Sequence, residues 1–212
     1  MVTVWDVFVR FSHWAVALGF FVAFVTEDDL MTLHVWAGYL VGALVVLRLV
    51  WGVVGPRHAR FADFVAGPRT VWAYLRQLIA FRAPRHLGHS PAGGAMAVAL
   101  WLGLLVVVWS GMEFYAIRDG RGPLAALDTG AAAASVSVAA PAAADDEAER
   151  SGARSDGSGV RRKAGAWKEF HEIVANFLMA LVALHVAGVV LACLAHRENL
   201  VRAMWDGKKR AE

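Results

Sequence analysis

Four apolar stretches, each long enough to cross a bilayer as a helix, constrain this chain of 212 residues more than any other feature. A spanning helix needs about 20 mostly apolar residues. The stretches cover residues 4–25, 32–54, 92–115 and 167–195. Hydrophobic residues make up 58% of the chain, which is more than a soluble domain usually carries. We therefore predict an all-α integral membrane four-helix bundle, with residues 1–212 as a single membrane domain.

The basic residues predict how this bundle is oriented. Six arginines and one aspartate lie between the second and third stretches, and three arginines and two lysines follow the fourth. The link between the first two stretches is acidic, at Glu27, Asp28 and Asp29. Because basic residues stay on the cytoplasmic side, both termini are expected in the cytoplasm of a bacterium and the protein in its inner membrane. The first stretch has polar residues in its first half, so it does not resemble a cleavable signal peptide.

Two segments outside the stretches have their own character. Residues 69–81 alternate apolar residues with Arg76 at helical spacing, which predicts a short amphipathic helix on the cytoplasmic surface. Residues 117–163 form a low-complexity link rich in Ala, Ser, Gly and Asp. Such a composition buries too little apolar surface to offset the entropy of ordering, so we predict a long disordered outer loop.

Histidines inside the apolar stretches fall into two pairs. His171 and His185 are 14 residues apart, so they share one helix face and lie about 21 Å apart along its axis. His34 and His171 each begin a stretch at the predicted outer surface. His13 and His185 both lie about 18 Å below that surface. The sequence therefore predicts an outer pair, His34 with His171, and an inner pair, His13 with His185.

Two imidazoles at one level suit a haem iron better than other metals. Zinc takes four ligands in one tetrahedron, whereas haem iron takes two axial ligands besides its porphyrin nitrogens. The only cysteine is Cys193 and no C-x-x-C-H motif is present, so the haem would be non-covalent and b-type. Two b-type haems with bis-histidine iron, suited to electron transfer, are the predicted cofactors.

Arginines near the inner pair could neutralise haem propionates. Arg48 lies 14 residues after His34, hence on the same face and at the inner level. Arg10 lies about one turn from His13. Arg48 could instead extend its side chain to the inner surface, and this alternative stays open.

Several stretches of the chain resemble the bacterial cytochrome b561 family, and most of all the b-type cytochrome subunit of nickel–iron hydrogenases. They are Val4–Trp14, Leu33–Tyr39, Arg48–Gly52, Leu87–Gly94 and the spacing from His171 to His185. The resemblance implies a four-helix bundle that carries electrons between a quinone pool and a partner redox protein. It implies that His13, His34, His171 and His185 are the haem ligands. It also places the turn around His89 beside the inner haem or a quinone pocket.

The expected function is transmembrane electron transfer in a respiratory chain. The expected partners are membrane lipid, quinone and a periplasmic redox protein, either a hydrogenase or a c-type cytochrome, and no nucleic acid. Membership of a quinone-linked oxidoreductase and assembly as a homodimer stay open. Two rival functions also remain, a haem-free membrane anchor of a redox complex and a histidine-based ion transporter. A transporter would need its ligands at one depth, whereas these histidines divide between two levels.

Overall fold

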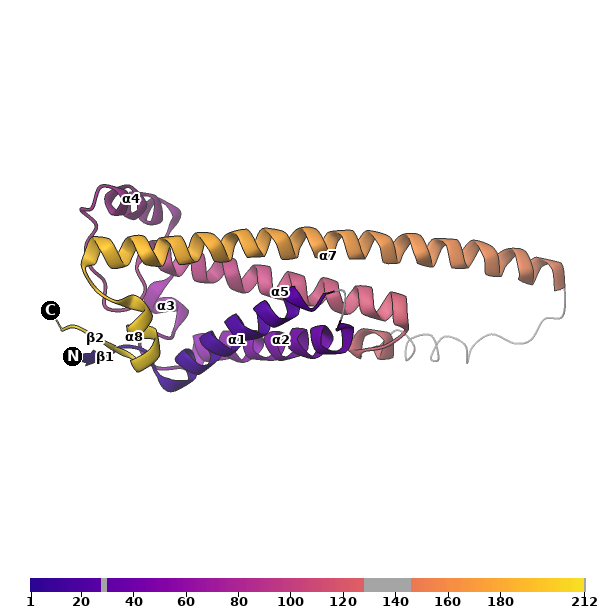
Figure 1. The fold of residues 1–212 in the computed structure, drawn as a ribbon, viewed down its shortest axis with the longest axis horizontal. Coiled ribbons are helices and arrows are strands. Elements are labelled where there is room, and N and C mark those ends of the chain that lie inside the picture. The colour runs from indigo at the N-terminus through magenta and orange to yellow at the C-terminus, as the bar shows by residue number, and fades with distance from the viewer. Residues whose placement is uncertain (28–29, 128–145, 212) are drawn as a thin grey trace. The chain divides into compact units, whose positions relative to one another are not determined.

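The computed structural model describes residues 1–27, 30–127 and 146–211, with no side chains described for residues 146–158. Figure 1 shows the ribbon with its helices and strands labelled. The chain divides into two compact units. Unit 1 comprises Met1–Leu105 and Asn176–Glu212, and unit 2 comprises Val106–Ala175. Each unit is described below by itself.

Four long helices dominate the described residues, and they confirm the all-α membrane bundle. They are α1 (Val7–Val25), α2 (Met31–Val54), α5 (Pro91–Asp119) and α7 (Asp146–His196). Each is long and apolar enough to cross a membrane, α7 through its part from Gly159 to His196. Exposed leucine, valine and phenylalanine side chains cover much of these helices, as is expected of surfaces that face lipid.

Capping side chains set where two of these helices begin. Asp6 accepts a hydrogen bond from the backbone N–H of Val9 at 2.9 Å, so α1 begins at Val7 rather than within the predicted stretch at residue 4. The Ser90 hydroxyl accepts one from the N–H of Gly93 at 3.1 Å, and Pro91 opens α5. These polar residues end the preceding segments and direct the chain into the bundle.

The link between the third and fourth apolar stretches differs from the expectation. Helix α5 continues to Asp119, and α7 begins at Asp146 rather than at residue 167, so residues 146–163 are helical. Extending a helix costs less than starting one, so the apolar part of α7 can propagate helix into polar sequence. Residues 128–145 of the predicted disordered loop lie outside the described residues.

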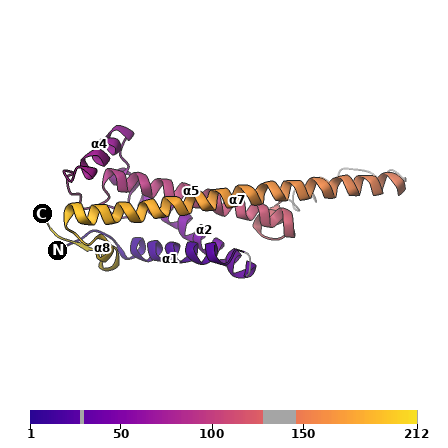
Figure 2. The same cartoon turned by 45° about the horizontal axis from the view of Figure 1, so that its top comes forward.

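The two termini meet at one end of unit 1. Strand β1 (Val2–Thr3) pairs antiparallel with β2 (Lys208–Lys209). Helices α3 (Phe61–Phe64), α4 (Pro68–Ile79) and α8 (Leu200–Asp206) lie at the same end (Figures 1 and 2). We call this the terminal end. Helix α4 confirms the predicted short surface helix, with Trp72 and Ile79 exposed on it.

A small core at the terminal end joins the start of the chain to the segment after α2. Val4, Trp5, Val9 and Ala59 are buried together there. Helices α1 and α2 pack closely enough that a Cβ added at Gly19 would lie 2.9 Å from a methyl of Val41. This packing holds the N-terminal half of α1, which carries Arg10 and His13.

Candidate functional site

His13 of α1 and His185 of α7 face each other inside unit 1. Their ring centroids are 6.4 Å apart and their planes are inclined by 54°. The Nδ1 atom of His13 is buried and has no hydrogen-bond partner among the described residues. The predicted inner pair therefore comes together from residues 172 positions apart.

The spacing of this pair fits a single iron between the rings. An imidazole nitrogen binds a first-row metal at about 2 Å, and the ring centroid lies about 1 Å further, so two axial ligands place their centroids about 6 Å apart. The observed 6.4 Å agrees with that value. Two histidines on separate helices at this distance can hold a haem iron. Among the described residues no third His, Cys, Asp or Glu joins them to make a zinc site.

Arg48 is a buried cation near the terminal end of α2. Only 5% of the residue is exposed, so it does not extend to the surface. Its Nη2 donates to the Ala59 carbonyl at 3.2 Å, and its guanidinium lies 4.8 Å from the Trp101 ring centroid. Its Nη1 is buried without a partner among the residues described. A buried cation with a free donor fits an anion such as a propionate carboxylate.

Arg10 is the second predicted arginine and lies on α1, three residues before His13. Its Nη1 donates to the Trp205 carbonyl of α8 at 2.6 Å, which fixes the side chain against the C-terminal tail. Its Nε is buried and unpaired within the described part of the chain. Both predicted arginines therefore retain one buried donor for an acidic group.

His89 lies in the turn before α5, between two aromatic rings. The Trp5 ring meets it edge-on at 4.6 Å between centroids, and the Phe64 ring lies at 4.4 Å. Burial lowers the pKa of His89 to about 3, and the positive charges of Arg48 and Lys209 lower it further. His89 is therefore neutral at physiological pH, and its buried Nδ1 has no partner in the described residues.

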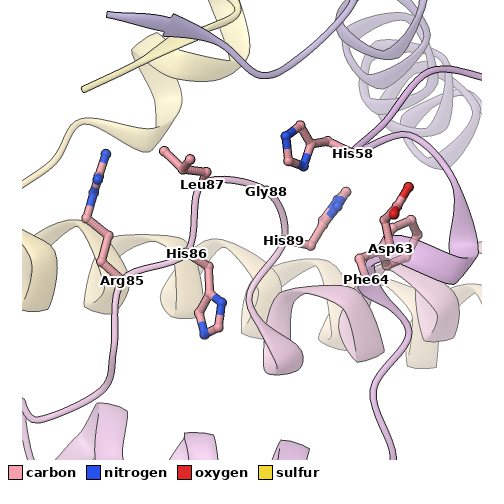
Figure 3. A pocket seen from close by; sticks show the side chains of 8 residues that line it. All are labelled: His58, Asp63, Phe64, Arg85, His86, Leu87, Gly88 and His89. Carbon is pink, nitrogen blue, oxygen red and sulfur yellow. The ribbon is translucent and has the colours of Figure 1, made fainter. Parts of the chain in front are cut away.

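A pocket of about 230 Å³ opens beside His89 at the terminal end. It is lined by His58, Asp63, Phe64 and the segment Arg85–His89. Figure 3 shows the imidazoles of His58 and His89 and the Asp63 carboxylate on one side of this segment, with His86 pointing away from them. Such a set of side chains can donate and accept protons at a small polar molecule.

The C-terminal tail holds the segment Arg85–His89 in place. Lys209, of which 6% is exposed, donates from Nζ to the carbonyls of His86 and Gly88, both at 3.4 Å. Arg85 donates to both carboxylate oxygens of Glu198, at 2.8 and 3.2 Å. We call these contacts the tail clasp. The sequence did not predict it, because a lysine in a basic tail has no local signature of burial.

The other two predicted ligands lie in different units. In unit 1, Nδ1 of His34 lies 2.8 Å from the Ala23 carbonyl of α1. A carbonyl only accepts, so Nδ1 of His34 carries the proton in this contact. In unit 2, Nδ1 of His171 lies 3.0 Å from the hydroxyl oxygen of Ser110 on α5. The pairing of His34 with His171 joins the two units and stays a prediction.

Three further histidines at the terminal end are half-buried although their sequence neighbours are basic. His58 lines the pocket, Nε2 of His86 is buried, and Nε2 of His196 lies 3.3 Å from the Tyr74 hydroxyl. Tyr74 of α4 contacts both His86 and His196. Trp5 and Ser110 were missed because neither residue type signals a site in an apolar sequence.

Comparison with known protein families identifies one match. The family model described as prokaryotic cytochrome b561 matches residues 4–207. This range contains the described parts of all four long helices and the Arg85–Glu198 contact of the tail clasp, and it ends two residues before Lys209. No curated protein and no solved structure matches the chain.

Proposed function

The chain belongs to the prokaryotic cytochrome b561 family, and from that premise we propose that it conducts electrons across the bacterial inner membrane between quinone and a periplasmic redox protein. The family implies b-type haem binding and transmembrane electron transfer. The observation that carries the proposal is the pair of His13 and His185, whose ring centroids are 6.4 Å apart. In the same unit Arg10 and Arg48 each have one buried donor without a partner among the described residues.

Two b-type haems supply the one-electron chemistry when bound. His13 of α1 and His185 of α7 would hold one iron, and His34 and His171 would hold the other. Arg10 and Arg48 would bind the carboxylates of the group at the first pair and neutralise their charge. Bis-histidine ligation leaves no open position for oxygen, which favours electron transfer over oxygen chemistry.

The pocket beside His89 is the proposed quinone site. Reduction of a quinone adds two protons as well as two electrons, so its site needs groups that exchange protons with water. His58 and Asp63 line the pocket together with His89, and neutral His89 can donate one hydrogen bond to a quinone oxygen. The pocket lies at the terminal end, which the distribution of basic residues predicts to face the cytoplasm.

The redox partner is proposed to act at the opposite side of the membrane, near His34 and His171. A hydrogenase or a periplasmic c-type cytochrome fits this role. The direction of electron flow follows from the relative potentials of the quinone and the partner, and either direction uses the same residues.

The test is reduction by a quinol. The purified protein in detergent is mixed with a short-chain quinol, and the b-type absorption bands are followed in reduced-minus-oxidised spectra. We expect quinol to reduce haem, and the variant His89→Gln to slow this reduction at least tenfold while dithionite still reduces the haem fully. Haem that dithionite reduces and quinol does not would contradict the quinone proposal and leave the haem assignment standing.

The haem-free anchor remains the second candidate, because residues 117–163 are long, polar and poor in large apolar side chains, as a docking segment can be. It makes an opposite prediction. An anchor would assemble normally and show no b-type spectrum either in the wild type or in His13→Ala.

A further inference from the structure

Ser110 of α5 makes a contact that the proposed function does not use. In unit 2 its hydroxyl oxygen lies 3.0 Å from Nδ1 of His171. The residue is 1% exposed, so water does not compete for the contact. The neighbouring Gly111 lets the ring approach, since a Cβ there would lie 2.9 Å from Cε1 of His171. Ser110 and Gly111 thus form the surface of α5 that the His171 ring contacts.

The direction of this hydrogen bond follows from the other partner of Ser110. A serine hydroxyl has a single hydrogen. It is directed at the Val107 carbonyl, 3.0 Å away, which can only accept. The oxygen of Ser110 therefore accepts from Nδ1–H of His171. This fixes the tautomer in which Nε2 carries the lone pair that a metal needs.

We propose that Ser110 is the positioning residue of the His171 ligand, orienting its ring and raising its basicity through the hydrogen bond to Nδ1–H. This inference rests on the proposed function, in which His171 binds haem iron. A hydrogen bond to the distal nitrogen of a ligating histidine makes the imidazole a stronger donor. Stronger donation stabilises ferric over ferrous iron, so Ser110 lowers the midpoint potential of the haem that His171 holds.

The chain offers a matched control in Ser12 of α1. It is 2% exposed, and its hydroxyl also donates to the carbonyl three residues earlier, that of Val9, at 3.2 Å. No histidine is among its hydrogen-bond partners in the described residues. Replacing Ser12 removes the same atom from a similar buried setting without touching a ligand's hydrogen bond.

The experiment compares Ser110→Ala, Ser110→Thr and Ser12→Ala in the haem-loaded protein by redox titration and by the low-temperature EPR spectrum of the ferric state. In Ser110→Ala we expect one haem to titrate at a higher potential with an altered EPR signal, while the other haem is unchanged. The dissociation constant of that haem, measured by its transfer to a scavenging apoprotein, should rise about 10- to 100-fold. Ser110→Thr keeps the hydroxyl and should restore the wild-type potential.

Three results would overturn the role of Ser110. They are wild-type potentials in a haem-loaded Ser110→Ala, an equal shift in Ser12→Ala, and no rescue by a folded, haem-loaded Ser110→Thr. A wild-type protein without b-type haem would overturn the proposed function and this role together, so the two failures are distinguishable.

Discussion

At the scale of single residues, the terminal end of unit 1 collects buried nitrogen atoms that have no partner in the described chain. Arg10, His13, Arg48, His86 and His89 each contribute one. An unsatisfied buried donor costs about 1–3 kcal/mol, more for a charged group. In the proposed function, a haem would supply iron for His13 and carboxylates for the two arginines, and a quinone would accept from His89.

Neutral His89 makes a prediction about acid stability. Its pKa is lowered to about 3 by burial, against 6.5 for an ordinary histidine. Between these values the unfolded chain binds a proton that the folded chain excludes, so acid destabilises the fold. His89→Gln should therefore lose less thermal stability than the wild type when the pH falls from about 8 to about 5. Melting temperatures over this range measure the effect.

Above pH 7 the two melting curves should run parallel, because His89 is neutral in both states there. A variant that loses as much stability in acid as the wild type would show that His89 is protonated within the fold.

How far single residues were predictable depends on their chemistry. Histidine and arginine in an apolar stretch are costly, so their presence alone indicated a site at His13, Arg48 and His185. A serine in an apolar helix costs little free energy when its hydroxyl bonds the backbone of the same helix, as Ser110 does. Its presence therefore gave no indication of the contact with His171.

At the scale of elements, length and apolarity were enough to predict α1, α2, α5 and the apolar part of α7. The early start of α7 was missed, because helix propagation depends on the neighbouring turn rather than on local composition. The pairing of β1 with β2 and the tail clasp were missed for a different reason. The strands join residues about two hundred positions apart and the tail clasp joins residues more than a hundred positions apart. No local pattern specifies such partners.

The tail clasp predicts that Lys209 stabilises the segment Arg85–His89. Lys209→Gln leaves two carbonyls without their ammonium donor, at a cost of about 1–3 kcal/mol. In a protein of this size each kilocalorie corresponds to about 2–4 °C of melting temperature. We expect Lys209→Gln to lower the melting temperature by the corresponding amount and to speed amide hydrogen exchange in residues 85–89.

Lys208→Gln is the control for this variant, because Lys208 is the adjacent strand residue and is exposed. It should leave both the melting temperature and the exchange rate unchanged. Equal effects of the two variants would show that the charge of the tail matters and not the buried contacts.

At the scale of the whole molecule, the basic segments assign a topology to the four helices. Both termini, the segment with α3 and α4, and the pocket beside His89 are expected on the cytoplasmic side. The links after α1 and after α5 are expected outside. This orientation brings cytoplasmic protons to the proposed quinone pocket and leaves the opposite side for a periplasmic partner.

Alkaline phosphatase fusions test this topology, since that enzyme is active only outside the cytoplasm. We expect a fusion after Gly122 to be active and a fusion at the C-terminus to be inactive. The reverse pattern would place the pocket in the periplasm and exclude proton uptake from the cytoplasm there.

The central claim is that two histidine pairs hold two b-type haems. The most direct measurement is the ratio of haem to protein in the purified chain, determined for the wild type, His185→Ala and His196→Ala. We predict two haems per wild-type chain, one in His185→Ala, and two in His196→Ala, a control from the same helix. A wild type without haem, or a His185→Ala protein that keeps both haems, would contradict the account.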